Sequence, residues 1–318
     1  MCIRDRPGAS VIALAEVASK MGVIDIQVST GQTLTNSIQN VAEGKTDIAA
    51  SPFILTFLMA NGLGPYAKLG KDSGSALASK LAVLYTYRVA VGGLYAYDSS
   101  DFEGWDGIEG ATIYNGPPRG AALTEARLLI KLNTGLEDGV GYTGIQVNWG
   151  QAVKTIQDGS ADAFVLPMGF PDGRITAALS SGDITIWSVP KNVYDGNEFN
   201  KVAGLPGTVG FEIPISDMGY GSGVTVVSED GNFRGLGTVG GEVVNVDMDF
   251  DTAKALTAAF IANIDVYKAK APFMQTAWHG ETDIKITDMC GTMPVKYHPG
   301  AVAAWEEAGY SLPACAKP

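Results

Sequence analysis

The sequence contains very little histidine or cysteine. Among its 318 residues there are two histidines, His279 and His298, and three cysteines. No two cysteines have CxxC spacing. A structural zinc site needs about four Cys or His ligands at short, regular spacings. The composition therefore argues against such a site, and we expect neither a metal nor another cofactor.

Long apolar runs and clusters of basic residues are also missing. No run approaches the roughly 18 consecutive apolar residues that a membrane-spanning helix requires. Lys and Arg number 22 against 34 Asp and Glu, a net charge of −12. The basic residues are scattered, so the electrostatic footprint of a nucleic-acid-binding protein is absent. With 46% hydrophobic and 18% charged residues, the chain can form a packed core.

The cysteines leave two alternatives open. Cys2 lies in the atypical opening segment MCIRDR, whereas Cys290 and Cys315 lie near the C-terminus. If Cys2 is set aside, the other two form an even pair. They could form one disulfide in an oxidising compartment or remain two unlinked thiols.

Two segments of the chain share one order of elements. Residues 24–52 predict a strand over 24–29, a helix from Thr33 that Gly44 ends, and a strand over 47–51. Residues 145–167 predict the same order, with strands over 145–148 and 163–166 around a helix that Gly159 ends. Three matches recur at one offset: Glu43-Gly44 with Asp158-Gly159, Asp47 with Asp162, and Pro52 with Pro167. We interpret these as parallel βαβ units in two similar lobes.

Further elements complete an α/β pattern. A strand over 111–114 leads through a Gly/Pro-rich turn to a helix with an apolar face of Leu123, Ala126, Leu129 and Ile130. GEVVNVDM predicts a strand, a helix runs from Phe250 to about 270 behind an Asp251-Thr252 cap, and HPGAVAAWEEAG begins another helix. The pattern predicts two parallel-centred sheets.

Two transitions suggest where the lobes divide. RVAVGGLYAYDSSDFEGWDGIEG and DGNFRGLGTVGGEVVNV are glycine-rich and are interpreted as linkers. They predict a discontinuous lobe one, residues 7–96 plus 234–318, and a lobe two over 97–233. A chain that crosses twice between lobes is typical of a hinged protein with a cleft between them.

The strand–turn–helix junctions are the candidate ligand sites. Ligands of open α/β sheets bind beyond the carboxyl ends of strands, where helix N-termini favour anions. STGQT supplies hydroxyl groups and a glycine, and NGPPRGAA supplies small residues and the Arg119 cation. The strand ends ASP and LPMG and the glycine-rich turn MGYGSG supply further neutral groups. The candidates from these junctions are Thr30, Gly31, Gln32, Thr33, Ser51, Asn115, Gly116, Arg119, Gly120, Ala121, Met168, Gly169 and Tyr220. Ordinary capping turns and strand ends are the structural alternative.

A catalytic set does not assemble from the sequence. GxSxG, GxxxxGK[ST] and HExxH are all absent. GLGTVGG lacks the spacing and context of a dinucleotide loop. His298 precedes a proline at a predicted helix start, which favours a capping role. We therefore expect a protein that is not an enzyme.

Three segments together resemble a known family. STGQTLTNSIQNVAEGKTDIAASP, IQDGSADAFVLPMGFP and PVKYHPGAVAAWEEAG are similar, in that order, to the TAXI-type solute receptors of TRAP transporters. The resemblance covers residues 7 to about 309. It implies a two-lobed type II periplasmic-binding fold, with a hinge and an interlobe cleft that closes on a small organic anion.

The resemblance also implies partners and contacts. The ligand would be glutamate-like, a 2-oxo acid or a dicarboxylate, delivered to a TRAP-type membrane permease by a periplasmic, monomeric receptor. It adds Ser10 to the predicted contacts of lobe one. In lobe two GPPRGAA replaces the family's hydroxyl-rich turn, so two alternatives stay open: Arg119 holds the anion, or the ligand is a different one. Residues 1–6 are expected to be an artefact of a truncated gene that has lost its signal peptide and first strand.

Two other classes of function remain open. One is an ABC-type receptor for another solute. The other is an enzyme on the same two-lobed fold, which would need a cofactor-bearing cysteine or several arginines in its cleft. A cytosolic effector-sensing domain is disfavoured, because no helix-turn-helix segment is visible.

Overall fold

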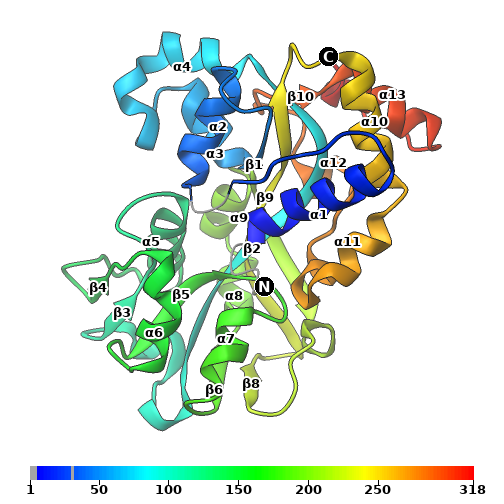
Figure 1. Ribbon diagram of the computed structural model, residues 1–318. Coiled ribbons are helices and arrows are strands. Elements are labelled where there is room, and N and C mark those ends of the chain that lie inside the picture. The colour runs from blue at the N-terminus through cyan, green and yellow to red at the C-terminus, as the bar shows by residue number, and fades with distance from the viewer. Residues whose placement is uncertain (1–5, 30–31) are drawn as a thin grey trace. The chain divides into compact units, whose positions relative to one another are not determined.

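The computed structural model describes residues 6–29 and 32–318 (Figure 1). Thr30 and Gly31, two of the predicted ligand contacts, therefore lie outside the described residues. The chain divides into two compact units. Unit 1 consists of Met1–Val89, Pro206–Thr208 and Thr238–Pro318, and unit 2 consists of Ala90–Leu205 and Val209–Gly237.

Two long strands carry the chain from one unit to the other. β2 (Leu81–Tyr97) begins in unit 1 and ends in unit 2, and β9 (Asn232–Asn245) runs from unit 2 into unit 1. Both strands are buried over nearly their whole length. In the described part of the chain, hydrogen bonds connect ten strands into one sheet, six of them in the order β1-β9-β2-β5-β3-β4. Of the other four, β10 pairs with β2, β6 with β2 and β8, and β7 with β9.

The glycine-rich stretch at 235–241, predicted as a linker, is in fact the middle of β9. Glycine is needed there because neighbouring backbones come very close. A Cβ on Gly235 would lie 2.6 Å from the carbonyl oxygen of Gly92, and one on Gly241 would lie 2.3 Å from that of Tyr85. The chain passes between the two units within this strand. Its strand form was not predicted, because glycine is found both in loops and in strands that another backbone approaches closely.

Unit 1 combines a short sheet with several helices. β1 (Ile48–Pro52) pairs antiparallel with β9, and β10 (Lys296–Tyr297) pairs parallel with β2. Its helices are α1 (Arg6–Lys20), α2 (Leu34–Ala42), α3 (Phe53–Ala60), α4 (Gly70–Ala78), α10 (Phe250–Ile261), α11 (Ile264–Lys270), α12 (Ile284–Thr287) and α13 (Pro299–Glu307).

Three predictions for unit 1 were wrong. Residues 24–29 form no strand, and Ile24 is exposed, so the apolar alternation there has no sheet to join. β1 is antiparallel to its neighbour rather than part of a parallel βαβ pair. The single helix expected over 250–270 is two helices, α10 and α11, and its cap is Asp249, whose Oδ1 accepts a 2.9 Å hydrogen bond from the Thr252 amide.

The predicted capping role of His298 is confirmed. Its Nδ1 accepts a 3.1 Å hydrogen bond from the Gly300 amide at the start of α13. The imidazole thereby satisfies a first-turn amide that has no partner within the helix. This contact gives His298 a structural role at the start of α13.

Unit 2 contains the parallel strands. β3 (Thr112–Tyr114) pairs parallel with both β4 (Thr143–Ile145) and β5 (Ala163–Met168), and β5 also pairs antiparallel with β2. The other strands are β6 (Ile184–Trp187), β7 (Thr208–Pro214), which begins in unit 1, and β8 (Val224–Val227). The expected pair of parallel-centred sheets is therefore wrong, since parallel and antiparallel pairs share one sheet.

The helices of unit 2 follow its strands. They are α5 (Ala121–Thr134), α6 (Ala152–Gln157), α7 (Gly173–Ala178), α8 (Lys191–Tyr194) and α9 (Asn197–Ala203). The predicted apolar face of α5 is confirmed, because all four of its residues are buried. Ala126, Leu129 and Ile130 join the core of unit 2 with strand residues that include Leu94, Ile113 and Val165.

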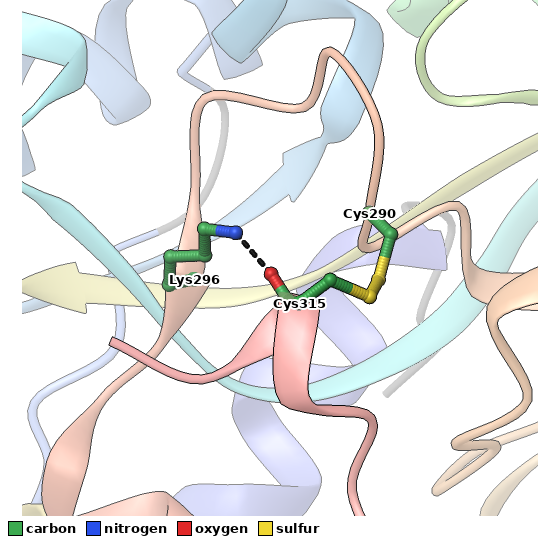
Figure 2. Close-up of a disulfide and its surroundings, with 3 residues drawn as sticks. All are labelled: Cys290, Lys296 and Cys315. Carbon is green, nitrogen blue, oxygen red and sulfur yellow. Dashed lines mark hydrogen bonds between the residues drawn. A yellow bond between two sulfur atoms is a disulfide. The ribbon is translucent and has the colours of Figure 1, made fainter.

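A disulfide joins Cys290 to Cys315 in unit 1 (Figure 2). Their Cα atoms are 5.5 Å apart, within the usual range for such a bond. The Lys296 ammonium donates a hydrogen bond to the Cys315 carbonyl oxygen, as Figure 2 shows. The C-terminal segment is thus attached to the loop that precedes β10.

Candidate functional site

Three parallel strands of unit 2 lie side by side, and β3 and β4 end in register, whereas β5 continues beyond them to Met168. Tyr114 at the end of β3 lies opposite Ile145 of β4 and Phe164 of β5. The turn over 115–120 follows β3 and enters α5 at Ala121. Gly116 and Gly120 have φ values of 104° and 108°, which residues with a side chain rarely adopt. These glycines allow the sharp turn that brings the α5 N-terminus to the strand ends.

The N-terminus of α5 has no side-chain cap. Its N-cap is Gly120, which has no side chain to accept hydrogen bonds from the first-turn amides. Uncapped amides and the helix dipole together favour an anion. The side chain of Arg119 next to them is exposed and makes no hydrogen bond or ion pair with any other described residue.

Asn115 has a supporting place in this turn. Its side chain is fully buried, and its Nδ2 donates to Asp138 Oδ2 over 3.2 Å. Its Oδ1 accepts a 2.8 Å hydrogen bond from Gln146 Nε2. Both ends of the amide are therefore engaged within unit 2, which makes Asn115 a support for the turn rather than a group facing a ligand.

A second arginine, not singled out in the sequence, follows the carboxyl end of β5 and lies within electrostatic reach of Tyr114 at the end of β3. Arg174 is the second residue of α7, whose N-cap Asp172 accepts a 2.8 Å hydrogen bond from the Arg174 amide. The guanidinium donates to the same carboxylate through Nε (3.1 Å) and Nη2 (2.9 Å). Nη2 also donates to the Pro167 carbonyl oxygen at the end of β5. The cation is thus held in one orientation by charge-assisted bonds.

Aromatic side chains surround Arg174. Its Cζ lies 5.3 Å from the centroid of the Trp149 ring, a cation–π distance. Tyr95 of β2 and Tyr114 of β3 are both fully buried and close enough to interact electrostatically with the guanidinium. Burial raises the pKa of Tyr114 to about 12, although the charge of Arg174 acts in the opposite direction. Both tyrosines are therefore neutral at physiological pH.

Arg174 remains charged in this environment. Burial by itself lowers the pKa of the guanidinium, but the charge and hydrogen bonds of Asp172 raise it by more. The side chain is only 16% exposed. The sequence carries a signal for the start of α7 at Asp172, because Asp-Gly after a strand is typical of a helix start. The sequence carries no signal that Trp149 and Arg174 lie together, because they come from segments far apart in the chain.

The remaining candidates of unit 2 separate into two groups. Tyr220 lies at the Arg174 cluster, since its Oη accepts a 3.0 Å hydrogen bond from the Asp172 amide. The Gly169 amide donates to Asp172 Oδ2 over 3.3 Å. Met168 is fully buried, and a Cβ on Gly93 would lie 2.1 Å from its Cε. The Met168 side chain is therefore part of the core rather than a wall of the site.

The candidates of unit 1 lie in different environments. Gln32 and Thr33 are exposed just before α2, and the Thr33 side chain makes no capping bond. Ser51 is buried in β1, where its hydroxyl donates to the Pro52 carbonyl oxygen over 3.3 Å. Ser10 on α1 is also buried, 3.4 Å from the Tyr85 hydroxyl. Of these four, only Gln32 and Thr33 present their side chains to solvent.

Ser10 lies beside a buried carboxyl group that sequence reasoning missed. Glu242 of β9 is 0% exposed, and neither carboxyl oxygen makes a hydrogen bond of ordinary geometry. Burial raises its pKa to about 8, while the nearby hydroxyls of Ser10 and Tyr87 lower it. Glu242 is thus protonated in the folded protein at neutral pH.

This buried carboxyl predicts that stability falls between pH 6.5 and 8. There the folded state keeps the Glu242 proton and the unfolded state, with a pKa near 4.5, has lost it. The free energy of unfolding should fall by roughly 1.4 kcal/mol per pH unit, about 2 kcal/mol in all. Below pH 6.5 His279, whose pKa burial lowers to about 4, acts in the opposite direction and offsets the effect. Urea unfolding of the wild type and Glu242→Gln measures this, and parallel pH profiles would contradict it.

Among residues 6–29 and 32–318, no three or more His, Cys, Asp or Glu side chains are grouped so that they could hold a metal ion. Within the same part of the chain, no helix combines the length and apolar character needed to cross a bilayer.

Comparison with known proteins gives a family and a fold. A model described as the NMT1-like family matches residues 7–309. No curated protein matches the chain. Among solved structures, a protein named as the periplasmic sulfonate-binding protein SsuA of a sulfonate ABC transporter from Methylobacillus flagellatus KT has a TM-score of 0.54. That match has 12% identity and covers 97% of this chain and 92% of that one.

Two other solved structures match at lower scores. The periplasmic aliphatic sulphonate binding protein SsuA from Escherichia coli has a TM-score of 0.45, with 11% identity over 95% of this chain and 80% of that one. A TRAP periplasmic solute binding protein from Rhodoferax ferrireducens, with bound malonate, has a TM-score of 0.40. That match has 11% identity and covers 96% of this chain and 78% of that one. The match above 0.5 shows that the fold is the two-lobed fold of periplasmic solute-binding proteins.

Proposed function

We propose that this chain, which belongs to the NMT1-like family, is a periplasmic receptor that captures a small organic anion for a membrane transporter. The family and the fold support a solute-binding role. One observation carries the anionic class of solute: Arg174 lies beyond the carboxyl end of the parallel strand β5, oriented by Asp172 and only partly exposed. Such strand ends are where α/β proteins bind ligands.

Arg174 is a better anchor for an anion than Arg119. A fixed guanidinium loses little side-chain freedom when it binds a carboxylate or sulfonate. Arg119 is exposed and makes no bond with other described residues that would hold it. It can still attract an anion to the uncapped N-terminus of α5, so we assign it the weaker contribution.

For the transporter, we propose an ABC-type partner first. The solved structure that matches with a TM-score above 0.5 is named as part of a sulfonate ABC transporter. A TRAP-type permease is the second candidate, favoured by the segments STGQTLTNSIQNVAEGKTDIAASP and PVKYHPGAVAAWEEAG. A gene for an ATPase or for a TRAP permease beside this one would discriminate between them.

A thermal-shift screen tests the proposal. The panel contains glutamate, 2-oxoglutarate, C4 dicarboxylates, 2-oxo acids and alkyl and aryl sulfonates. A solute present at 100 times its dissociation constant adds about 2.7 kcal/mol to stability, which raises Tm by about 5 °C. We expect at least one anion to raise Tm in this way. A panel without any shift would contradict the proposed function.

Three variants locate the anion. Arg174→Gln should abolish the shift, and Arg119→Ala should reduce it by less. Lys201→Ala is the matched control, because its side chain is 69% exposed on α9 and forms only a surface ion pair with Glu198. If Arg119→Ala abolished the shift while Arg174→Gln preserved it, the anchor would be Arg119.

A further inference from the structure

The donors of Arg174 are not equally occupied. Nε and Nη2 are bonded to Asp172, and Nη2 also donates to the Pro167 carbonyl oxygen. Nη1 makes no hydrogen bond with any described residue, and it is not among the buried unpaired atoms. One edge of a fixed guanidinium therefore remains open to an oxygen acceptor.

Arg174 and Asp172 form an ion pair of one cation and one anion. Asp172 is 2% exposed and neutralises the positive charge that Arg174 brings. A single carboxylate or sulfonate can still bind the open N–H groups, which are fixed and directional. A second negative charge on the solute would have no cation of this pair left to balance it. The pair therefore favours a monoanion.

Trp149 adds a flat apolar surface beside the same cation. It is 46% exposed, although its ring lies 5.3 Å from Arg174 Cζ. Gly150, the next residue, has no atom near the position of a Cβ, so the chain beside the ring is uncrowded. Aromatic pairs gain free energy beyond the area that they bury. A ring attached to the anion could contact Trp149 while the anion contacts Arg174.

A buried hydroxyl supports a binding role for this cluster. The Tyr95 side chain is 0% exposed, and its Oη has no hydrogen-bond partner. It lies close enough to Arg174 and Asp172 for their charges to act on it. A buried donor without a partner is costly, and a bound polar group is one way to satisfy it.

We infer that Arg174 and Trp149 make unit 2 selective for a monoanion whose carboxylate or sulfonate is attached to an aromatic ring. This inference rests on the proposed function and names the chemical class of its solute. Arg174 supplies the direction of the anion, and Trp149 supplies the preference for a flat ring.

Isothermal titration calorimetry with matched probes tests the inference. Benzoate and cyclohexanecarboxylate have the same charge and similar size, but only benzoate is flat. Benzenesulfonate and succinate complete the panel. We expect benzoate or benzenesulfonate to bind, and benzoate to bind about three- to tenfold tighter than cyclohexanecarboxylate.

Variants separate the two contributions. Trp149→Leu should bring the benzoate and cyclohexanecarboxylate affinities close to each other, whereas Trp149→Phe should keep the preference. Arg174→Gln should weaken the binding of both probes. If Arg174→Gln fails to fold, Arg174→Lys, which keeps the charge beside Asp172, replaces it as the test of the same loss. Circular dichroism verifies the fold of each variant.

Each outcome has a distinct meaning. The inference would be overturned if the wild type bound benzoate and cyclohexanecarboxylate with equal affinity. It would also be overturned if Trp149→Leu weakened the binding of both probes by the same factor. Binding of succinate without binding of any ring-bearing probe would also overturn it and leave the proposed function intact. Failure of every anion in this panel and in the thermal screen would overturn the proposed function itself.

Discussion

Replacing Trp305 with alanine is expected to lower the free energy of unfolding by about 3–5 kcal/mol. The side chain is 0% exposed on α13, and its Nε1 donates a 3.0 Å hydrogen bond to the Leu84 carbonyl oxygen of β2. Its ring also contacts Phe260 of α10 edge-on, with centroids 6.0 Å apart. Truncation would leave a cavity between helix and strand and a buried carbonyl without its partner.

Urea unfolding followed by circular dichroism measures this loss. Trp305→Phe should cost less than Trp305→Ala, because it keeps most of the buried volume, although it loses part of the ring and the hydrogen bond. Trp149→Ala is the matched control, since Trp149 is 46% exposed and should cost little stability. Similar losses for Trp305→Ala and Trp149→Ala would contradict the burial that the structure assigns to α13.

Removing the disulfide is expected to lower the free energy of unfolding by about 3.5 kcal/mol. Cys290 and Cys315 are separated by 25 residues in sequence. A cross-link of that span reduces the entropy of the unfolded chain by an amount worth about this much at 25 °C. The double variant Cys290→Ser/Cys315→Ser should therefore unfold at clearly lower urea concentration than the wild type.

A reductant gives an internal control for this prediction. Dithiothreitol should bring the wild type to the stability of the double variant and leave the double variant unchanged. If the oxidised wild type and the double variant had the same urea midpoint, the disulfide would not contribute to stability as the structure indicates.

Helices with a clear periodicity were the predictable part of the fold. The face of Leu123, Ala126, Leu129 and Ile130 is buried because residues three and four apart lie on one side of a helix. That relation is local and needs no knowledge of the rest of the chain. The cap at His298 was equally local, since Pro299 fixes where α13 begins.

Strand pairing was not predictable from the same evidence. β1 has the apolar pattern of a strand, but its antiparallel partner β9 is almost two hundred residues further along the chain. Nothing in residues 24–52 encodes that choice. The glycines of β9 suggested a loop because the approach of Gly241 to Tyr85 is visible only in three dimensions.

The sequence led to the turn that enters α5, but it did not lead to the Arg174 cluster on which the proposed function rests. The turn that enters α5 was identified from its glycines and from Arg119. Arg174 was not singled out because its contacts with Asp172 and with Trp149, which comes from a different connection, are visible only in three dimensions. Met168 was misplaced, because the end of a strand says little about which of its side chains face the core.

The measurement that tests the central claim most directly is a calorimetric titration followed by recovery of the solute. The wild type is titrated with an anion that raised its Tm, and the solute is then recovered and analysed by mass spectrometry. A solute receptor should bind one molecule per chain and release it chemically unchanged. Conversion of the solute, or the absence of saturable binding, would contradict this account.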